Sequence, residues 1–284
     1  MSDGNLLRAD WLGACRRMVE AQRELFARDR TIAGRTVHEG RGEGGDEALA
    51  IDRRAEDIVF AELDALHAAG HEFTAISEER GQVEFGDGSD PHRIVIDPID
   101  GSLNARRTIP SFALSLAVAR GETMEDVEFG YVYDFGAHEE FSARRGEGAR
   151  LRDEPLRAIG PGLGLEVVGI EAAKPERIIG MLEQLEGRAQ RIRALGSIAI
   201  MLCWVAGGRL DGMLTGRACR SVDVAAAQLV AREAGALVDF PGFELNETSL
   251  SLGERYHVTA GTDSEKLETL REVQAFADPA PQPS

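Results

Sequence analysis

The chain of 284 residues is long enough to form one large domain or two medium ones around a substantial core. Its formal net charge of −17 argues against a nucleic-acid partner, because such binding needs a basic surface. No apolar run approaches the roughly 18 residues of a membrane-spanning helix, and the polar N-terminus does not resemble a signal peptide. We therefore expect a cytoplasmic protein that does not bind membranes.

The first half of the chain is predicted to contain two helices and then a series of strands. Apolar residues at helical spacing predict one helix over 7–25 and another from Asp52 to a stop at Gly70. The polar, glycine-rich stretch 33–46 between them predicts a flexible surface loop. Short strands are expected at 73–77, 93–97, 113–118, 127–132 and 139–143.

The second half alternates strands with helices. Strands are expected at 165–170, 191–193, 210–214, 236–240 and 257–260, and helices after Pro175, Ser197, Ser221 and Asp263 or Ser264. We divide the chain into an N-terminal α+β half, a C-terminal α/β half and a disordered tail, at residues 1–150, 151–275 and 276–284. No repeat and no long linker is found, so the two halves should pack tightly together.

The segment IVIDPIDGSLN is the most informative one for chemistry. A short apolar strand ends in Asp97, and Pro98 forces an extended or turning backbone, so Asp97 and Asp100 can point to one side. Mg²⁺ prefers such oxygen ligands. The backbone N–H groups of Gly101 and Ser102 could cradle a phosphate. The alternative is that Asp100, Gly101 and Ser102 form an ordinary turn without a ligand.

Further carboxylates lie at positions that would suit the same site. Glu78 and Glu79 follow a predicted strand, and next to Asp97 they would supply the charge that a second cation needs. Asp52 and Asp223 each open a predicted helix. Each of these carboxylates also has a simpler interpretation. Glu78 and Glu79 could be solvated surface residues, and the helix dipole alone could favour the two aspartates at the starts of their helices.

In this order the segments resemble the inositol monophosphatase superfamily. Its pattern is an acidic pair after a strand, then D-P-[IL]-D-G-[ST]-x-N with a downstream proline, then W-D-x-A-A-G before a helix. The counterparts here are 77–79, Asp97 to Asn104 with Pro110, and Val222 to Ala227, supported by Asp52, Arg145 to Ala149 and Leu195 to Ser197. The resemblance spans about residues 46–238 and is closest to archaeal-type fructose-1,6-bisphosphatase/inositol monophosphatase members.

The resemblance implies an α/β (α+β) fold, a layered αβαβα sandwich, a homodimer and two or three Mg²⁺ ions per site. Glu78, Asp97 and the carbonyl of Ile99 would hold the first ion. Asp97, Asp100 and Asp223 would hold the second, and Glu78 would help with a third.

The resemblance also implies the catalytic groups. Ser102 and Asp52 would orient the attacking water, with Glu78 as a third catalytic residue, and Gly101 and Ser102 would bind the phosphate. Phosphoryl transfer depends mainly on positioning and charge neutralisation, so water can attack directly and no cysteine nucleophile is needed.

The departures from the family pattern concern the substrate. Inositol-phosphate enzymes carry a glutamate shortly before the last aspartate, whereas residues 212–222 hold no carboxylate and contain Arg217 and Arg220 instead. Arginines suit a second anionic group better than a neutral polyol. Arg106, just past the phosphate loop, and Ser197 are further candidates for substrate binding.

These observations lead to three hypotheses. The first is a Mg²⁺-dependent phosphatase that acts on a sugar or polyol phosphate such as fructose-1,6-bisphosphate or inositol-1-phosphate. The second is a 3′-phosphoadenosine-5′-phosphate phosphatase. The third is a catalytically silent relative that binds metal or phosphate as a dimeric regulator. Val222, Ala227 and Thr108 depart from the family pattern and leave room for the third, but every carboxylate that the chemistry needs is present.

Overall fold

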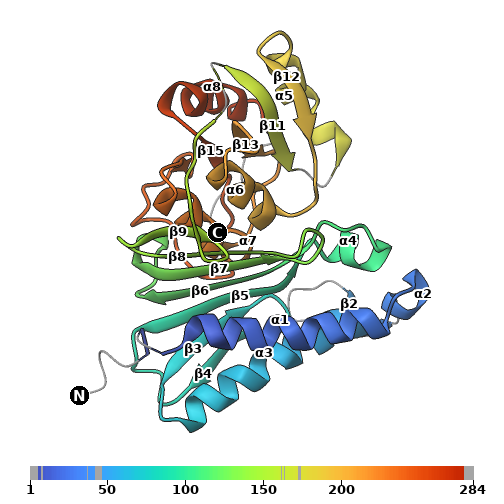
Figure 1. Ribbon diagram of the computed structural model, residues 1–284, viewed down its shortest axis with the longest axis vertical. Helices are drawn as coiled ribbons and strands as arrows, with labels where there is room; N and C mark the ends of the chain where they lie inside the picture. Colours follow the sequence, from blue (N-terminus) through green and yellow to red (C-terminus); the bar gives the residue numbers. More distant parts are fainter. Residues whose placement is uncertain are drawn as a thin grey trace.

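Five layers of helix and sheet make up this computed structural model, which describes residues 6–7, 9–36, 38–41, 47–160, 162, 164–171 and 174–277. Helices α1 and α3 cover the outer face of an eight-stranded sheet, and helices α6 and α7 separate this sheet from a five-stranded one. Helices α5 and α8 cover the far side of the second sheet (Figure 1). This order confirms the predicted α/β (α+β) fold and its αβαβα sandwich.

The eight-stranded sheet carries the N-terminal half of the chain. Its strand order is β10-β9-β8-β7-β6-β5-β3-β4, and neighbours are antiparallel except for β3 and β5. The strands are β3 (Phe73–Ser77), β4 (Gly81–Phe85), β5 (His92–Asp100), β6 (Ala113–Arg120), β7 (Val127–Asp134), β8 (Glu139–Arg144), β9 (Gly148–Leu151) and β10 (Glu154–Leu156). Because β3 and β5 are parallel, their C-terminal ends emerge at the same edge of the sheet.

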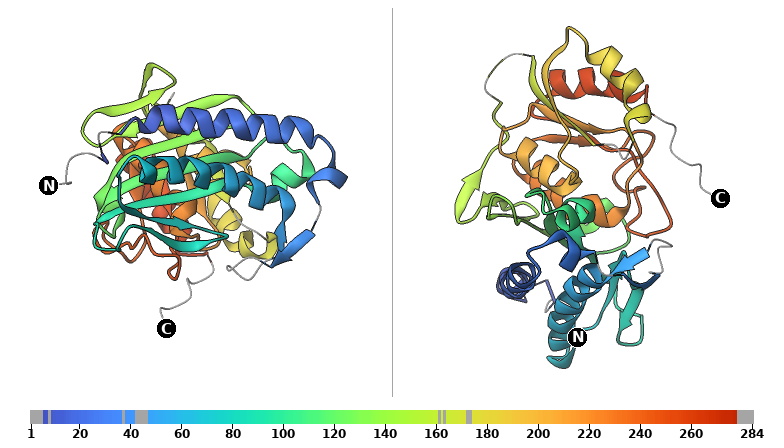
Figure 2. Two further views of the ribbon diagram at one scale, coloured as in Figure 1. Left: turned by 90° about the horizontal axis from the view of Figure 1, so that it is seen from below. Right: turned by 90° about the vertical axis from the view of Figure 1, so that its right-hand side faces the viewer.

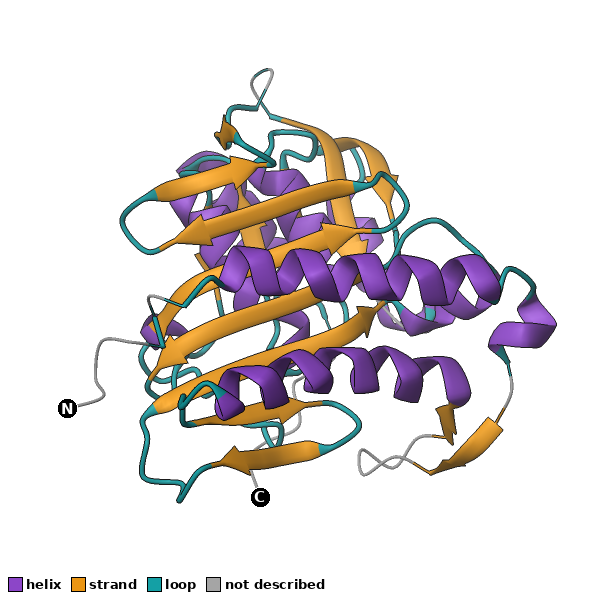
Figure 3. Ribbon diagram, turned by 60° about the horizontal axis from the view of Figure 1, so that its bottom comes forward, coloured by secondary structure: helices purple, strands orange, loops and turns teal. Residues whose placement is uncertain are grey.

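Helices α1 (Trp11–Arg28) and α3 (Ala50–Ala68) lie side by side on the outer face of this sheet (Figures 2 and 3). Helix α1 turns Trp11, Cys15 and Met18 toward the sheet, and all three are fully buried. Along the chain, three short elements follow α1 and precede α3: α2 (Ile32–Arg35), β1 (His38–Arg41) and β2 (Glu47–Leu49). Strands β1 and β2 pair antiparallel. The surface loop expected at 33–46 is therefore wrong where the structure describes it, and residues 37 and 42–46 lie outside the described residues.

The five-stranded sheet has the order β12-β11-β13-β15-β14. Its strands are β11 (Leu165–Glu171), β12 (Ala189–Arg193), β13 (Gly212–Thr215), β14 (Leu237–Asp239) and β15 (Thr259–Gly261). The remaining helices are α4 (Ser102–Arg107), α5 (Ile179–Leu185), α6 (Ile198–Ala206), α7 (Ser221–Glu233) and α8 (Ser264–Gln274). Strand β11 is parallel to both β12 and β13, so the chain segments that leave β11 and β13 start at one edge.

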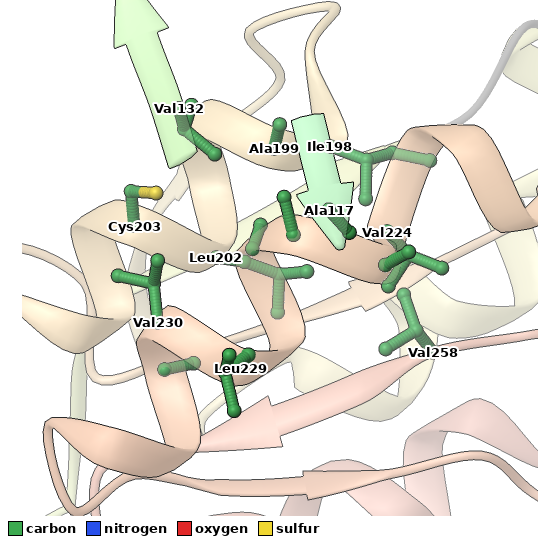
Figure 4. Packing of buried hydrophobic residues seen from close by; sticks show 14 of the residues in the cluster. Ala117, Val132, Ile198, Ala199, Leu202, Cys203, Val224, Leu229, Val230 and Val258 are labelled. Atoms are coloured by element: carbon green, nitrogen blue, oxygen red, sulfur yellow. The ribbon is translucent and has the colours of Figure 1, made fainter. Parts of the chain in front are cut away.

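The central helices pack against both sheets at once. Buried side chains of α6 and α7, among them Leu202, Leu229 and Val230, form one apolar cluster with residues of both sheets (Figure 4). Helix α7 comes so close to β7 that a Cβ on Gly130 would lie 2.5 Å from the carbonyl oxygen of Ala226. The small residues 225–227 therefore allow the close packing that their size suggested, and this contact fixes α7 against β7.

Most predicted elements are confirmed, and the differences have local causes. Strands β4, β9 and β10 were not predicted, because they are only three to five residues long and only partly buried. Pro175 opens a 3₁₀ turn (Pro175–Arg177) rather than α5 itself. Ser221 is the first residue of α7, and its cap is Arg220, whose backbone N–H bonds to the Asp223 side chain.

Two further expectations concern the ends of the chain and the membrane. Residues 278–284 of the predicted tail lie outside the described residues, whereas 276 and 277 follow α8 directly. Among the described residues, no helix combines the length and the apolar character needed to cross a bilayer.

Candidate active site

The acidic segments from both halves of the chain meet around one pocket of about 260 Å³. The pocket lies where β5 and β11 end and where α6 and α7 begin. Its lining includes five carboxylates (Glu78, Asp97, Asp100, Glu171, Asp223), three arginines (Arg217, Arg220, Arg255) and the backbone of Ile99, Gly101 and Ser102. The structure thus brings together the residues that the sequence predicted as metal ligands.

The end of β5 is shaped by Pro98. The register of β5 against β6 shifts between Asp97 and Asp100, and the Ile99 N–H donates a hydrogen bond of 2.9 Å to Asp97 Oδ1. Proline cannot donate to the strand ladder, so such an irregularity is expected where it lies inside a strand. As a result both Asp97 and Asp100 line the pocket, although they are only 5% and 6% exposed.

Asp100 is held by the N-terminus of α6, an interaction across 97 residues of chain. Its Oδ2 accepts hydrogen bonds from the Ser197 hydroxyl at 2.5 Å and from the Ala199 N–H at 2.8 Å. Ser197 is itself buried and caps α6 by accepting from the Ile200 N–H. The N-terminus of a helix favours a carboxylate at this position.

Asp223 lies in the first turn of α7 and faces Glu78 and Asp97. Its Oδ2 accepts from the Arg220 N–H at 2.8 Å, and the Arg220 guanidinium forms an ion pair with Glu78. One carboxylate oxygen from each of Glu78, Asp97 and Asp223 lies within 4.8 Å of the other two. These three residues come from the β3–β4 turn, β5 and α7.

The electrostatics of this cluster favour a bound cation. Burial, together with the charges of Asp100 and Asp223, raises the pKa of Asp97 well above its usual value. Burial and the charge of Asp223 raise the pKa of Asp100 to about 8. Burial also raises the pKa of Asp223. A divalent cation would remove this repulsion, and an all-oxygen donor set is the kind that Mg²⁺ takes, so the residues fit the ion.

The loop of Gly101 and Ser102, for which we predict phosphate binding, lies beside the carboxylates and needs its glycine. Gly101 has a φ of +93° and precedes α4, and a Cβ on it would come within 2.8 Å of the Gly196 carbonyl oxygen. Asn104 ties α4 to the neighbouring loops by donating to the carbonyls of Ser111 and Leu195, at 2.7 and 2.5 Å. The exposed Ser102 therefore stands at a fixed place on the pocket wall.

Three arginines form a positively charged part of the pocket lining, the basic wall. Arg217 and Arg220 come from the segment between β13 and α7, and Arg255 comes from the segment before β15. Burial and the charge of Arg220 lower the pKa of Arg255. Within the described ranges, neither Arg217 nor Arg255 forms an ion pair with a carboxylate, so both remain available to an anion.

Three predicted residues lie outside the pocket lining. Asp52 is half-buried in the first turn of α3, close enough to Asp97 for its charge to raise the pKa of that residue. Arg106 lies on α4, and its contact with substrate stays a prediction. For Ser197, predicted to bind substrate, the structure indicates a different use, because its hydroxyl is engaged with Asp100.

Two charged residues of the lining, Glu171 and Arg255, were missed by sequence reasoning. Glu171 ends β11, and its Oε2 accepts from the Gly196 N–H at 2.8 Å. Its place at the C-terminal end of a predicted strand is a usable signal, because ligands of α/β sheets bind at such ends. For Arg255 the sequence contains no such signal, since it stands in an irregular segment.

Cys219 also lines the pocket, but its chemistry is unfavourable for attack on phosphorus. Burial, together with the charge of Asp223, raises the pKa of its thiol well above the usual value. The thiol is therefore protonated at neutral pH, and thiolate is the nucleophilic form. This agrees with the expectation that no cysteine is needed.

Comparisons with known proteins show the family to which the chain belongs. The model of the inositol monophosphatase family matches residues 11–275. The fructose-1,6-bisphosphatase/inositol-1-monophosphatase of Thermococcus kodakarensis is 35% identical over 85% of this chain and 87% of its own length. The Nus factor SuhB of Pasteurella multocida is 33% identical over 81% of this chain and 83% of its own.

Solved structures show the same fold. A crystal structure of an inositol monophosphatase–fructose 1,6-bisphosphatase has a TM-score of 0.77 at 27% identity and covers 93% of this chain and 99% of its own. The extragenic suppressor protein SuhB from Bartonella henselae has a TM-score of 0.75 at 27% identity and covers 93% of this chain and 98% of its own.

Proposed function

Because the chain belongs to the inositol monophosphatase family, we propose that it hydrolyses a sugar or polyol phosphate with Mg²⁺, by direct attack of water. Membership of this family makes the chain a metal-dependent phosphatase. The observation that carries the finer proposal is the cluster of Glu78, Asp97 and Asp223 next to the Gly101 loop. It provides a site for cations directly beside a site for a phosphate.

The metal ligands are assigned as follows. Glu78, Asp97 and the carbonyl of Ile99 would hold one Mg²⁺, Asp97, Asp100 and Asp223 a second, and Glu78 would help with a third. When bound, the ions lower the pKa of water and neutralise the charge of the leaving oxygen. Asp97 would be shared by the first two ions, and one of its carboxylate oxygens lies within 4.8 Å of oxygens of both Glu78 and Asp223.

The protein's own groups position the reactants. The N–H groups of Gly101 and Ser102 hold the phosphate at the start of α4. The Ser102 hydroxyl and the Asp52 carboxylate orient the attacking water, with Glu78 as the third catalytic residue. Ser197 acts indirectly, by keeping the Asp100 carboxylate turned toward the pocket.

Two features of the pocket bear on the substrate. Arg217 and Arg255 suit a second anionic group, and Arg220 adds its charge while it contacts Glu78. Glu171 places a carboxylate in the pocket, although residues 212–222 contain none, and a carboxylate can accept hydrogen bonds from sugar hydroxyls. Fructose-1,6-bisphosphate has both a second phosphate and sugar hydroxyls, and we rank it ahead of inositol-1-phosphate.

We further propose a cytoplasmic homodimer. Leu103 in α4 and Ile109, two residues after its end, are 56% and 47% exposed, and exposed large apolar side chains favour a protein contact where they form one patch. A second copy of the chain is the proposed partner. Sedimentation at micromolar concentration tests this, since a monomer would contradict it.

The first experiment is phosphate release from a panel of esters, with Mg²⁺ and then with EDTA. The panel contains fructose-1,6-bisphosphate, inositol-1-phosphate, 3′-phosphoadenosine-5′-phosphate and p-nitrophenyl phosphate. We expect metal-dependent release, fastest from the bisphosphate. A preference for the adenosine nucleotide would select the nucleotide phosphatase instead. No release from any ester, with intact Mg²⁺ binding, would support the catalytically silent regulator. A relative named Nus factor SuhB is the reason to keep this alternative in the test.

A further inference from the structure

One ligand of the proposed metal centre sits on a turn, whereas the others sit on regular elements. Asp97 belongs to β5 and Asp223 to α7, but Glu78 follows the last residue of β3 and lies in the turn to β4. Turns are less rigid than helices and strands, and a ligand must be held within a fraction of an ångström. Some other group must therefore fix this turn.

Glu56 on α3 is bonded to both ends of the turn. Its Oε1 accepts hydrogen bonds from the Ser77 hydroxyl and, at 3.2 Å, from the Arg80 N–H. Its Oε2 lies 3.5 Å from Arg80 Nε. Ser77 immediately precedes Glu78, and Arg80 follows it by two residues, so the backbone that carries Glu78 is held on either side.

The setting of Glu56 makes this clamp stiff. The residue is 1% exposed and Ser77 is fully buried, so water does not compete for these hydrogen bonds. Asp52 lies one helical turn before Glu56, on the same face of α3. Helix α3 thereby sets the distance between the Asp52 side chain and the turn that carries Glu78.

We propose that Glu56 is a positioning residue for the metal centre, which fixes the Glu78 turn and so sets the affinity for the cation. The proposal rests on the proposed function, because it assumes that Glu78 binds Mg²⁺. Groups that hydrogen-bond directly to metal ligands change metal affinity by about 10- to 100-fold when they are removed. Glu56 acts in the same way on the residues that flank Glu78, and not on Glu78 itself.

The test is calorimetric titration of the substrate-free protein with Mg²⁺, with activity against Mg²⁺ concentration as a second readout. Glu56→Ala removes both hydrogen bonds, and we expect the Kd for Mg²⁺ to rise by about 10- to 100-fold. Glu56→Gln keeps an oxygen for Ser77 and Arg80, so its Kd should stay within about threefold of the wild-type value. Saturating Mg²⁺ should restore most of the turnover of Glu56→Ala.

Glu62→Ala is the matched control. Glu62 lies on the same helix, is largely buried and pairs with Arg17 on α1 at 2.9 Å, so its loss perturbs α3 but leaves the Glu78 turn intact. Its Kd for Mg²⁺ should match that of the wild type. A folded Glu56→Ala variant with wild-type Mg²⁺ affinity, or an equal loss in Glu62→Ala, would overturn the proposal.

Ser77→Ala covers the case in which Glu56→Ala does not fold. It removes one of the two hydrogen bonds and should raise the Kd for Mg²⁺ by at least about threefold, whereas an unchanged value would reject the clamp. A wild-type protein that binds no Mg²⁺ would instead contradict the proposed function. The two failures are therefore distinguishable.

Discussion

The two walls of the pocket are built in different ways. On the acidic wall, Asp97 and Asp100 are buried and Asp223 is half-buried, and all three accept hydrogen bonds from backbone N–H groups at the ends of strands and helices. On the basic wall, Arg255 donates to backbone carbonyls of its own segment, and Arg217 is exposed.

This contrast separates the chemistry from the choice of substrate. The acidic wall is part of the framework, so its geometry cannot change without disturbing β5, α6 and α7. The basic wall consists of side chains on connecting segments, where substitutions are tolerated. We therefore expect changes on the first wall to affect turnover of every substrate, and changes on the second to affect only some.

The largest effect is expected from Asp97→Asn. The substitution removes a carboxylate shared by both proposed cations, so kcat should fall by more than about 100-fold on every ester, because a direct ligand matters more than the groups behind it. Circular dichroism should show an intact fold, since the change relieves the repulsion within the cluster. Asp223→Asn should behave alike, and near-wild-type kcat in either variant would refute the metal assignment.

A selective effect is expected on the basic wall. Arg217→Ala and Arg255→Ala should lower kcat/KM for a bisphosphate by about 10- to 100-fold, which is what the loss of a charge-assisted hydrogen bond costs. Hydrolysis of p-nitrophenyl phosphate should change little. Arg106→Ala, at a residue outside the pocket lining, tests the predicted contact between Arg106 and the substrate by the same two measurements. Equal losses of kcat/KM on both esters would mean that the basic wall does not act on the choice of substrate separately from turnover.

A smaller effect is expected from Ser197→Ala, which removes one of the two hydrogen bonds to Asp100 Oδ2. If Ser197 positions Asp100, kcat should fall by about 10-fold while KM for substrate stays the same, and the Mg²⁺ requirement should rise. A higher KM with unchanged kcat would favour the substrate contact that the family resemblance suggested.

The smallest effect is a pH dependence of stability in EDTA. Because burial and Asp223 raise the pKa of Asp100 to about 8, the folded metal-free protein holds this proton more tightly than the unfolded chain. The stabilisation is complete below pH 4 and is lost as the pH rises toward 8. Urea unfolding should therefore show a steeper loss between pH 5 and 8 for the wild type than for Asp100→Asn. Parallel curves would contradict the shift.

The sequence by itself determined the local features of this protein. The proline and glycine of D-P-I-D-G-S restrict the backbone through their own covalent structure, and helical periodicity located α1 and α3. The order of the acidic segments was enough to identify the family and, through it, the layered fold. Short, partly buried strands such as β4 were not predicted, because a pattern of three to five residues is too short to distinguish a strand from a turn.

Only the tertiary structure decided which distant residues serve the site. Ser197 reaches Asp100 because α6 begins where β5 ends, and Glu56 reaches the Glu78 turn because α3 crosses the end of β3. Arg255 joins the pocket from a segment without a pattern. These contacts between distant segments depend on how the layers pack against each other. Hydrophobic packing between layers involves many segments at once, so the residue spacing within one segment does not predict it.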